Sequence, residues 1–205
     1  CRRELGLPLD APVLVSVGTL VERKGFHRVI DCLPVLRERF PELRYLVVGG
    51  AGPEGDWSEH LRTRVDELGL VDCVRFLGHR WPEELPAILS AADVFVLATR
   101  NEGWANVFLE AMACGRPVVT TNVGGNAEGV SGPSIGTIVP YGDEKALETA
   151  LLSALETEWD SALIRAYARS CDWTKRVEVL IDEFRALKYG NMASTGHVAA
   201  GGSVV

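Results

Sequence analysis

The stretch AADVFVLATRNEGWANVFLEAMACG, residues 91–115, decides the fold class of this chain. Its first part, 91–99, is an apolar, β-branched run typical of a buried parallel strand. Its second part, 105–114, is rich in helix-forming residues. The stretch therefore predicts a strand, a turn and the start of a helix. Unpaired backbone N–H groups at a helix start favour an anion, so we expect an anion site at this turn.

Two carboxylates lie on either side of the predicted turn. Glu102 is in the loop and Glu110 falls about one turn into the helix, with seven residues between them. A carboxylate repels phosphate but accepts hydrogen bonds from hydroxyl groups. An anion site beside two such acceptors suits a phosphorylated polyol, such as a nucleotide sugar. The alternative is that Glu110 is a solvated helix residue and Gly103 only a turn residue.

The rest of the chain repeats the alternation of strand and helix, which is typical of an α/β fold. We expect a doubly wound parallel sheet of about six strands, Rossmann-like, with helices on both faces. The expected strands are 12–18, 43–48, 73–77, 93–98, 117–121 and 135–139. The expected helices are 26–39, 57–69, 82–91, 105–114, 143–155, 158–170 and 173–187.

The domain organisation follows from length and composition. A chain of 205 residues suits one α/β domain better than two, and we assign that domain to residues 1–190. Residues 191–205 are small, Gly-rich and without apolar periodicity, so we expect a disordered tail.

Net charge, apolar run length and cysteine spacing argue against a nucleic-acid-binding protein, a transmembrane protein and a disulfide-rich protein. The formal net charge of −7 gives no general attraction to nucleic acid or to an anionic membrane. No apolar run approaches the ~20 residues that a transmembrane helix needs. The five cysteines form no CxxC pair. We therefore expect them to be small, reduced core residues of a cytoplasmic protein.

A second segment points to the same ligand as the first. In APVLVSVGTLVERKGF, residues 11–26, an apolar strand leads into a loop with Arg23 and Lys24, and then into a helix. Lys24 would therefore lie beside a helix N-terminus, where phosphate binds readily. Taken alone, Lys24 could equally be a solvated lysine.

Five segments in continuous order resemble the donor-binding half of the retaining glycosyltransferases of family 4, which have two Rossmann-like domains (the GT-B type). The resemblance extends over residues 1–187, and the order of the segments makes it specific. The segments are VSVGTLVERKGF (15–26), YLVVGGAGPEG (45–55), VRFLGH (74–79), NEGWANVFLEAMACGRPVVTTNVGG (101–125) and CDWTKRVEVLIDEF (171–184).

The resemblance implies roles for individual residues toward a nucleotide diphosphate sugar. Lys24 would contact the pyrophosphate and Glu102 the hydroxyls of the transferred sugar, which makes them the expected catalytic residues. Glu110 would contact the ribose. Backbone groups of 104–107 would line the sugar and the diphosphate, and the loop at Gly78 would border the base. The further expected donor-binding residues are Gly18, Thr19, Arg23, Gly50, Gly78, His79, Gly103, Trp104, Ala105, Asn106 and Val107.

The resemblance also implies that the protein needs no metal ion and no cofactor besides the substrate. No DxD motif occurs in the chain, and the resembled family relies on protein cations and helix dipoles to hold the diphosphate.

One position departs from the family. An arginine commonly follows the glycine that ends the first strand, whereas this chain has Thr19 there. Threonine supplies neither a positive charge nor a bidentate fork. Two possibilities stay open: Arg23 compensates, or donor binding is weaker.

The resembled enzymes pair this domain with an N-terminal acceptor domain of similar size, which nothing here matches. We therefore expect a donor half that does not transfer sugar to an acceptor on its own, and that retains the anomeric configuration in the whole enzyme. In the full-length protein, peripheral association with the inner membrane face is an alternative to a purely cytoplasmic location. A non-catalytic nucleotide-sugar-binding or partner-docking module is the alternative function.

A dinucleotide-binding oxidoreductase is a further alternative, because Gly50, Gly52 and Gly55 form GxGxxG after a strand. Two features disfavour it. Pro53 removes an N–H group from the loop that would hold the pyrophosphate, and the nearby acid, Asp72, precedes the next strand instead of ending it.

Overall fold

The computed structural model describes residues 1–171 and 173–189. The chain divides into two compact units, the first Cys1–Ala168 and the second beginning at Arg169. The predicted tail, 191–205, lies outside the described residues, so its disorder stays a prediction.

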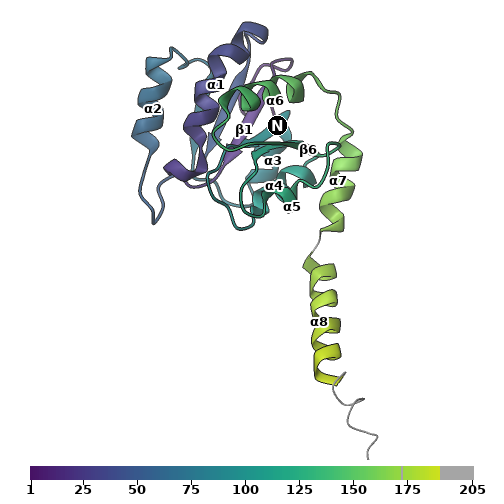
Figure 1. Ribbon diagram of the computed structural model, residues 1–205. Coiled ribbons are helices and arrows are strands. Elements are labelled where there is room, and N and C mark those ends of the chain that lie inside the picture. Colours follow the sequence, from purple (N-terminus) through teal and green to yellow (C-terminus); the bar gives the residue numbers. More distant parts are fainter. Residues whose placement is uncertain (172, 190–205) are drawn as a thin grey trace, which may run out of the picture. The chain divides into compact units, whose positions relative to one another are not determined.

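A sheet of six parallel strands forms the centre of the first unit (Figure 1). Its order is β3-β2-β1-β4-β5-β6, and every neighbouring pair is parallel. The predicted α/β class and strand number are confirmed. The strands are β1 (Val13–Val17), β2 (Arg44–Val48), β3 (Val74–Gly78), β4 (Val94–Leu97), β5 (Val118–Thr121) and β6 (Gly136–Val139).

Helices connect the strands and cover both faces of the sheet. The α-helices are α1 (Phe26–Arg39), α2 (Ser58–Glu67), α3 (Leu85–Ala91), α4 (Asn106–Ala113), α5 (Asn126–Gly129), α6 (Glu144–Glu156), α7 (Ser161–Ser170) and α8 (Trp173–Tyr189), and η1 (Glu22–Lys24) is a 3-10 helix. The sequence predicted seven of these helices. It missed η1 and α5, which are too short to show a helical period.

The core has two parts, one on each face of the sheet. Strand β1 shows why: Leu14 packs into the cluster beneath α1, α2 and α6, whereas Val13 and Val15 pack into the cluster beneath α3, α4 and α7. Successive side chains of a strand point to opposite faces, so β1, which is apolar at four of its five positions, belongs between two helical layers.

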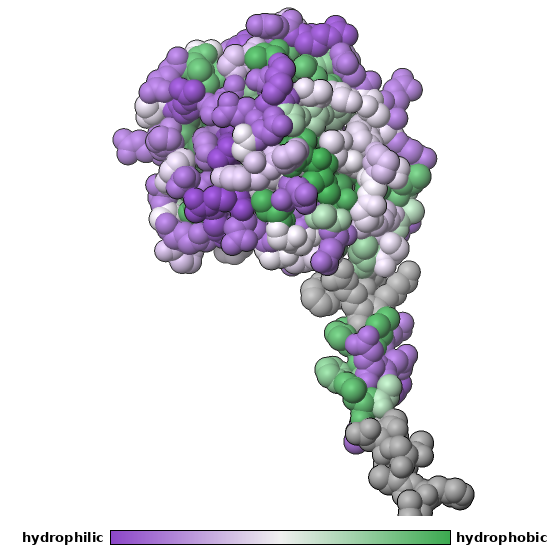
Figure 2. Space-filling model, viewed as in Figure 1, coloured by the Kyte–Doolittle hydropathy of each residue, from purple (hydrophilic) through white to green (hydrophobic). Residues whose placement is uncertain are grey.

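Hydrophilic residues cover most of the first unit on the face that Figure 2 shows. In the second unit, α8 exposes apolar side chains at Val177, Leu180, Ile181 and Phe184. None of the helices in the described part of the chain combines the length and the apolar character needed to cross a membrane. All five cysteines are free, but only Cys32 and Cys73 are buried, so the prediction of core cysteines is right for these two.

Candidate functional site

The candidate site lies at the carboxyl ends of β1 and β4. These two strands are neighbours in the sheet, and the connections from them run in opposite directions. Ligands of open α/β sheets bind at such a reversal point. The loops after β1 and β4 are joined by the Arg100 N–H group, which donates to the Arg23 carbonyl at 2.7 Å. The Thr99 hydroxyl lies 3.0 Å from the carbonyl oxygens of Arg23 and Asn101.

Gly25 lets the start of α1 approach the end of β4. Its φ of 74° lies in the left-handed region. A Cβ atom at this position would lie 2.0 Å from the carbonyl oxygen of Ala98, which no side chain tolerates. Glycine therefore places the preceding residue, Lys24, beside the loop that carries Glu102.

Lys24 and Glu102, the two expected catalytic residues, form an ion pair. Lys24 Nζ lies 2.5 Å from Glu102 Oε2, and the two side chains are only 14% and 13% exposed. Arg23 Nη1 is 3.9 Å from the same carboxylate oxygen. Because the pair is largely shielded from solvent, salt screens it less than an exposed pair. The structure thus joins residues 78 positions apart in the chain.

The loop after β5 supports the backbone of Glu102. The Gly125 N–H group donates to the Glu102 carbonyl at 3.2 Å. Gly124 has a φ of 50°, and a Cβ atom there would lie 1.8 Å from the same carbonyl oxygen. Nothing in the local sequence around these two glycines indicates a role for them, because their contact with Glu102 is long-range.

Arg23 has a second carboxylate partner that the sequence analysis missed, Glu54. Arg23 Nε and Nη2 each donate to one oxygen of Glu54 at 2.6 Å. These hydrogen bonds raise the pKa of Arg23 and lower the pKa of Glu54. Glu54 lies in the loop after β2, where Gly52 and Gly55 bond to each other through both backbone N–H groups.

Thr19 lies against the same loop. A Cβ atom at Gly52 would come within 2.1 Å of the Thr19 methyl carbon, so glycine makes room for this side chain. Position 19 provides no cation to the site. Arg23 and Lys24 supply the positive charge around Glu54 and Glu102.

A pocket of about 240 Å³ opens at the carboxyl ends of β1, β2 and β3. Its size approaches that of small-ligand pockets, which begin near ~300 Å³. Four of the predicted residues line it, and Gly78 ends the adjoining strand β3. The lining residues are Val17, Gly18, Thr19, Val48, Gly49, Gly50, Ala51, His79, Arg80 and Leu85.

The residues predicted from the second loop lie at the start of α4. Gly103 and Trp104 precede Ala105, which is the N-cap, and the helix begins with Asn106 and Val107. Ala105 has no side-chain cap, and the Phe108 N–H group donates to the Ala105 carbonyl, so the N–H groups of Asn106 and Val107 are the ones available to an anion.

Glu110 follows one turn later in α4, as predicted. It is exposed as a residue, yet surrounding protein atoms desolvate its carboxyl group and raise its pKa. It forms no ion pair with any residue that the structure describes. The structure therefore leaves Glu110 apart from the Lys24–Glu102 pair.

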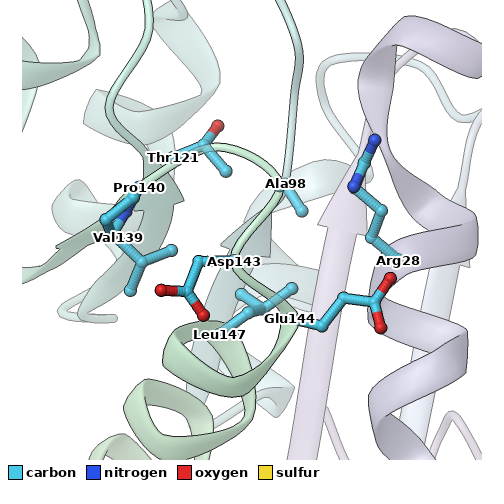
Figure 3. Close-up of a pocket in the computed structure, with 9 residues that line it drawn as sticks. Arg28, Ala98, Thr121, Val139, Pro140, Asp143, Glu144 and Leu147 are labelled. Atoms are coloured by element: carbon cyan, nitrogen blue, oxygen red, sulfur yellow. The ribbon is translucent and has the colours of Figure 1, made fainter.

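A much smaller hollow lies near the carboxyl ends of β4, β5 and β6 (Figure 3). Its volume of about 10 Å³ holds no more than a water molecule. Figure 3 shows Arg28 of α1 facing the segment that leads into α6, where Asp143 and Glu144 lie. Arg28 also stacks on Tyr141, with the guanidinium carbon 4.5 Å from the ring centroid. This hollow is too small for a nucleotide or a sugar.

Residues 1–171 and 173–189 contain no group of three or more His, Cys, Asp or Glu side chains that could hold a metal ion. The expectation that the reaction needs no metal stays a prediction.

The family described as "Glycosyl transferases group 1" matches residues 1–171. The chain is 36% identical over 193 residues to a D-inositol 3-phosphate glycosyltransferase of Corynebacterium urealyticum; the match covers 91% of this chain and 46% of that protein. It is 40% identical over 149 residues to a GDP-mannose-dependent alpha-(1-6)-phosphatidylinositol monomannoside mannosyltransferase of Mycolicibacterium smegmatis, covering 69% of this chain and 38% of that protein.

Among solved structures, the chain is similar to Anabaena Alr3699/HepE in complex with UDP and glucose. The TM-score is 0.77 at 27% identity, and the match covers 90% of this chain and 50% of that chain. The chain thus spans half or less of the length of each of these three proteins.

Proposed function

The chain belongs to the glycosyl transferases group 1 family, and we propose that it binds a nucleotide diphosphate sugar as the donor half of a retaining glycosyltransferase of family 4. The observation that carries this proposal is the contact between Lys24 and Glu102 at the reversal point of the sheet. A cation for phosphate and an acceptor for sugar hydroxyls meet there, as a glycosyl phosphate requires.

In the proposed complex the diphosphate lies between Lys24 and the uncapped N-termini of α1 and α4. Cleavage of the glycosyl–phosphate bond leaves negative charge on the diphosphate, and these groups stabilise that charge where it develops. A nucleotide leaves as a stable anion, so no carboxylic acid needs to protonate it. Glu102 and Glu110 are accordingly not an acid and nucleophile pair.

Donor binding requires an exchange of partners, because Lys24 and Glu102 already bind each other. Phosphate replaces Glu102 at Lys24, and sugar hydroxyls replace Lys24 at Glu102. Glu110 accepts from the ribose, and backbone groups from Gly103 to Val107 border the sugar and diphosphate. The base occupies the 240 Å³ pocket beside Gly50 and His79.

The acceptor half is proposed to be the N-terminal domain of a longer protein. Residues 1–190 then form the donor-binding domain, and its site lies within the first compact unit. Attack by the acceptor hydroxyl on the face that the diphosphate leaves, with the departing phosphate taking the hydroxyl proton, gives retention. We propose a cytoplasmic location, with peripheral contact to the inner membrane face as the alternative for the longer protein.

Thr19 favours a second candidate, a nucleotide-sugar-binding or docking module without chemistry of its own. Position 19 lacks the family's arginine. The two cations at the site, Arg23 and Lys24, already have the carboxylate partners Glu54 and Glu102. Joining the chain to its N-terminal domain distinguishes the two candidates: sugar transfer supports the enzyme, and donor binding without transfer supports the module.

Thermal unfolding with a panel of nucleotide diphosphates and their sugar conjugates tests donor binding. At about ten times the dissociation constant, a ligand should stabilise the fold by about 1.4 kcal/mol, which is a shift of a few degrees. Uracil, guanine and adenine nucleotides belong in the panel, because the base and the sugar remain open. No shift from any of them at millimolar concentration would contradict the proposal.

A further inference from the structure

The ion pairs at the candidate site form one cluster whose formal charges cancel. Its members are the cations Arg23 and Lys24 and the carboxylates Glu54 and Glu102. Glu54 binds two nitrogens of Arg23, Nε and Nη2. The remaining nitrogen, Nη1, lies 3.3 Å from the Asn101 carbonyl oxygen and 3.9 Å from Glu102 Oε2. Arg23 therefore presents one nitrogen toward the Lys24–Glu102 pair and the other two toward Glu54.

We infer that Glu54 is a specificity-determining residue that favours the nucleotide diphosphate sugar over the free nucleoside diphosphate left after transfer. The inference rests on the proposed function. The sugar conjugate carries about two negative charges and the free diphosphate about three at neutral pH, because a terminal phosphate loses its second proton near pH 6. A fixed carboxylate beside the phosphate site opposes the more highly charged ligand more strongly.

Several contacts keep Glu54 charged and in place. Its two hydrogen bonds to Arg23 are charge-assisted and bidentate, which is the strongest arrangement of this kind. They lower the pKa of the Glu54 carboxyl group, so it is ionised at neutral pH. The mutual backbone bonds of Gly52 and Gly55, at 2.9 and 3.0 Å, hold the loop on either side of it.

Because residue 19 is threonine, no additional cation offsets the negative charge of Glu54. An arginine at position 19 would add a positive charge and leave the cluster with a net attraction for additional phosphate charge. With threonine there, the cluster is neutral, and a ligand gains little from a further negative charge. The consequence for the proposed reaction is weaker retention of the product nucleotide, which assists its release.

Calorimetric titration of Glu54→Gln tests the inference with a nucleotide diphosphate sugar, the matching diphosphate and the matching triphosphate. Removal of one negative charge should tighten binding by about two- to threefold for each further ligand charge, so the gain rises along this series. The gain should shrink in high salt, which screens exposed charges. Glu54→Asp keeps the charge and should keep most of the wild-type preference.

Glu156→Gln is the matched control. Glu156 is also an exposed carboxylate that binds an arginine Nε, with Arg39 at 2.9 Å, but it ends α6, on a different helix from any part of the candidate site. Glu156→Gln should leave the affinity for all three ligands unchanged. If Glu54→Gln changed the affinity for all three ligands by the same factor, or lowered it independently of salt, the inference would be overturned and the proposed function would stand. A wild-type chain that binds none of the ligands would overturn the proposed function and the inference with it.

Discussion

At the scale of single residues, the Lys24–Glu102 ion pair determines how charge is arranged at the candidate site. Lys24 is proposed to bind phosphate and Glu102 to bind the sugar. Lys24 Nζ and Glu102 Oε2 are 2.5 Å apart, and both side chains are largely shielded from solvent. A ligand that takes only one of them leaves the other without its partner, and an unpaired charge in a shielded position is unfavourable. A complete nucleotide sugar satisfies both.

The first prediction concerns Glu102→Gln. The variant keeps the shape of the side chain but loses the charged acceptor, so it should weaken binding of the sugar conjugate without weakening binding of the plain nucleoside diphosphate. Calorimetric titration of the folded variant with both ligands measures the difference. Equal losses for both ligands would mean that Glu102 meets a different part of the donor.

The second prediction uses the raised pKa of Glu110. Its carboxyl group titrates above the ordinary value of 4.5, so the folded protein binds this proton more tightly than the unfolded chain. The resulting cost to stability is present above the raised pKa and disappears as the pH falls below 4.5. If the carboxylate binds ribose, affinity for the sugar conjugate should fall as the pH falls through the raised pKa.

Titration of the sugar conjugate between pH 7 and pH 4.5 measures this effect, because neither phosphate of the conjugate has a proton that titrates in that range. Glu110→Gln should bind more weakly at pH 7 and lose this part of the pH dependence. A pH profile identical to that of the wild type would argue against Glu110 as the ribose acceptor.

At the scale of elements, hydrophobic pattern and turn residues were enough to place all six strands and the longer helices. Strand β1 is an example, because four of its five residues are apolar, which already indicates burial on both faces. Local pattern also placed Lys24 before α1 and Glu102 before α4. Local pattern could not predict the contact between Lys24 and Glu102, since this contact depends on which strands are neighbours in the sheet.

The parts of the site that sequence analysis missed depend on close approach between loops. Glu54 lies within a GxGxxG pattern that suggested a dinucleotide site, and nothing local indicates that its carboxylate reaches Arg23. Gly124 is an ordinary turn glycine in the sequence, and only the fold brings it against the Glu102 carbonyl.

The third prediction tests that contact with Gly124→Ala. Alanine in the left-handed region costs about 1–2 kcal/mol, and its Cβ atom would also collide with the Glu102 carbonyl oxygen. We expect the melting temperature to fall by roughly 3–8 °C, with weaker binding of the sugar conjugate. Gly132→Ala is the control, since no atom lies within 4 Å of a Cβ built there. Equal melting temperatures for the two variants would show that the loop yields without cost.

At the scale of the whole molecule, every residue assigned to the donor site lies in the first compact unit. The fourth prediction is that the purified chain does not transfer sugar to an added acceptor, because the residues assigned to the donor site do not hold an acceptor against the anomeric carbon. Slow hydrolysis of the donor is the most we expect. A product assay with labelled donor measures both, and robust acceptor-dependent transfer would overturn the two-domain proposal.

Calorimetric titration of a nucleotide diphosphate sugar into the wild-type chain and Lys24→Ala, with a chelator present, tests whether this chain binds the donor through Lys24 and without a metal ion. We expect saturable binding to one site in the wild type and a tenfold to hundredfold loss in Lys24→Ala, since a charge-assisted bond contributes about 1.5–3 kcal/mol. Lys145→Ala, which removes an exposed lysine of α6, should bind as the wild type does. Binding that survives Lys24→Ala unchanged, or that requires a divalent metal, would contradict the account.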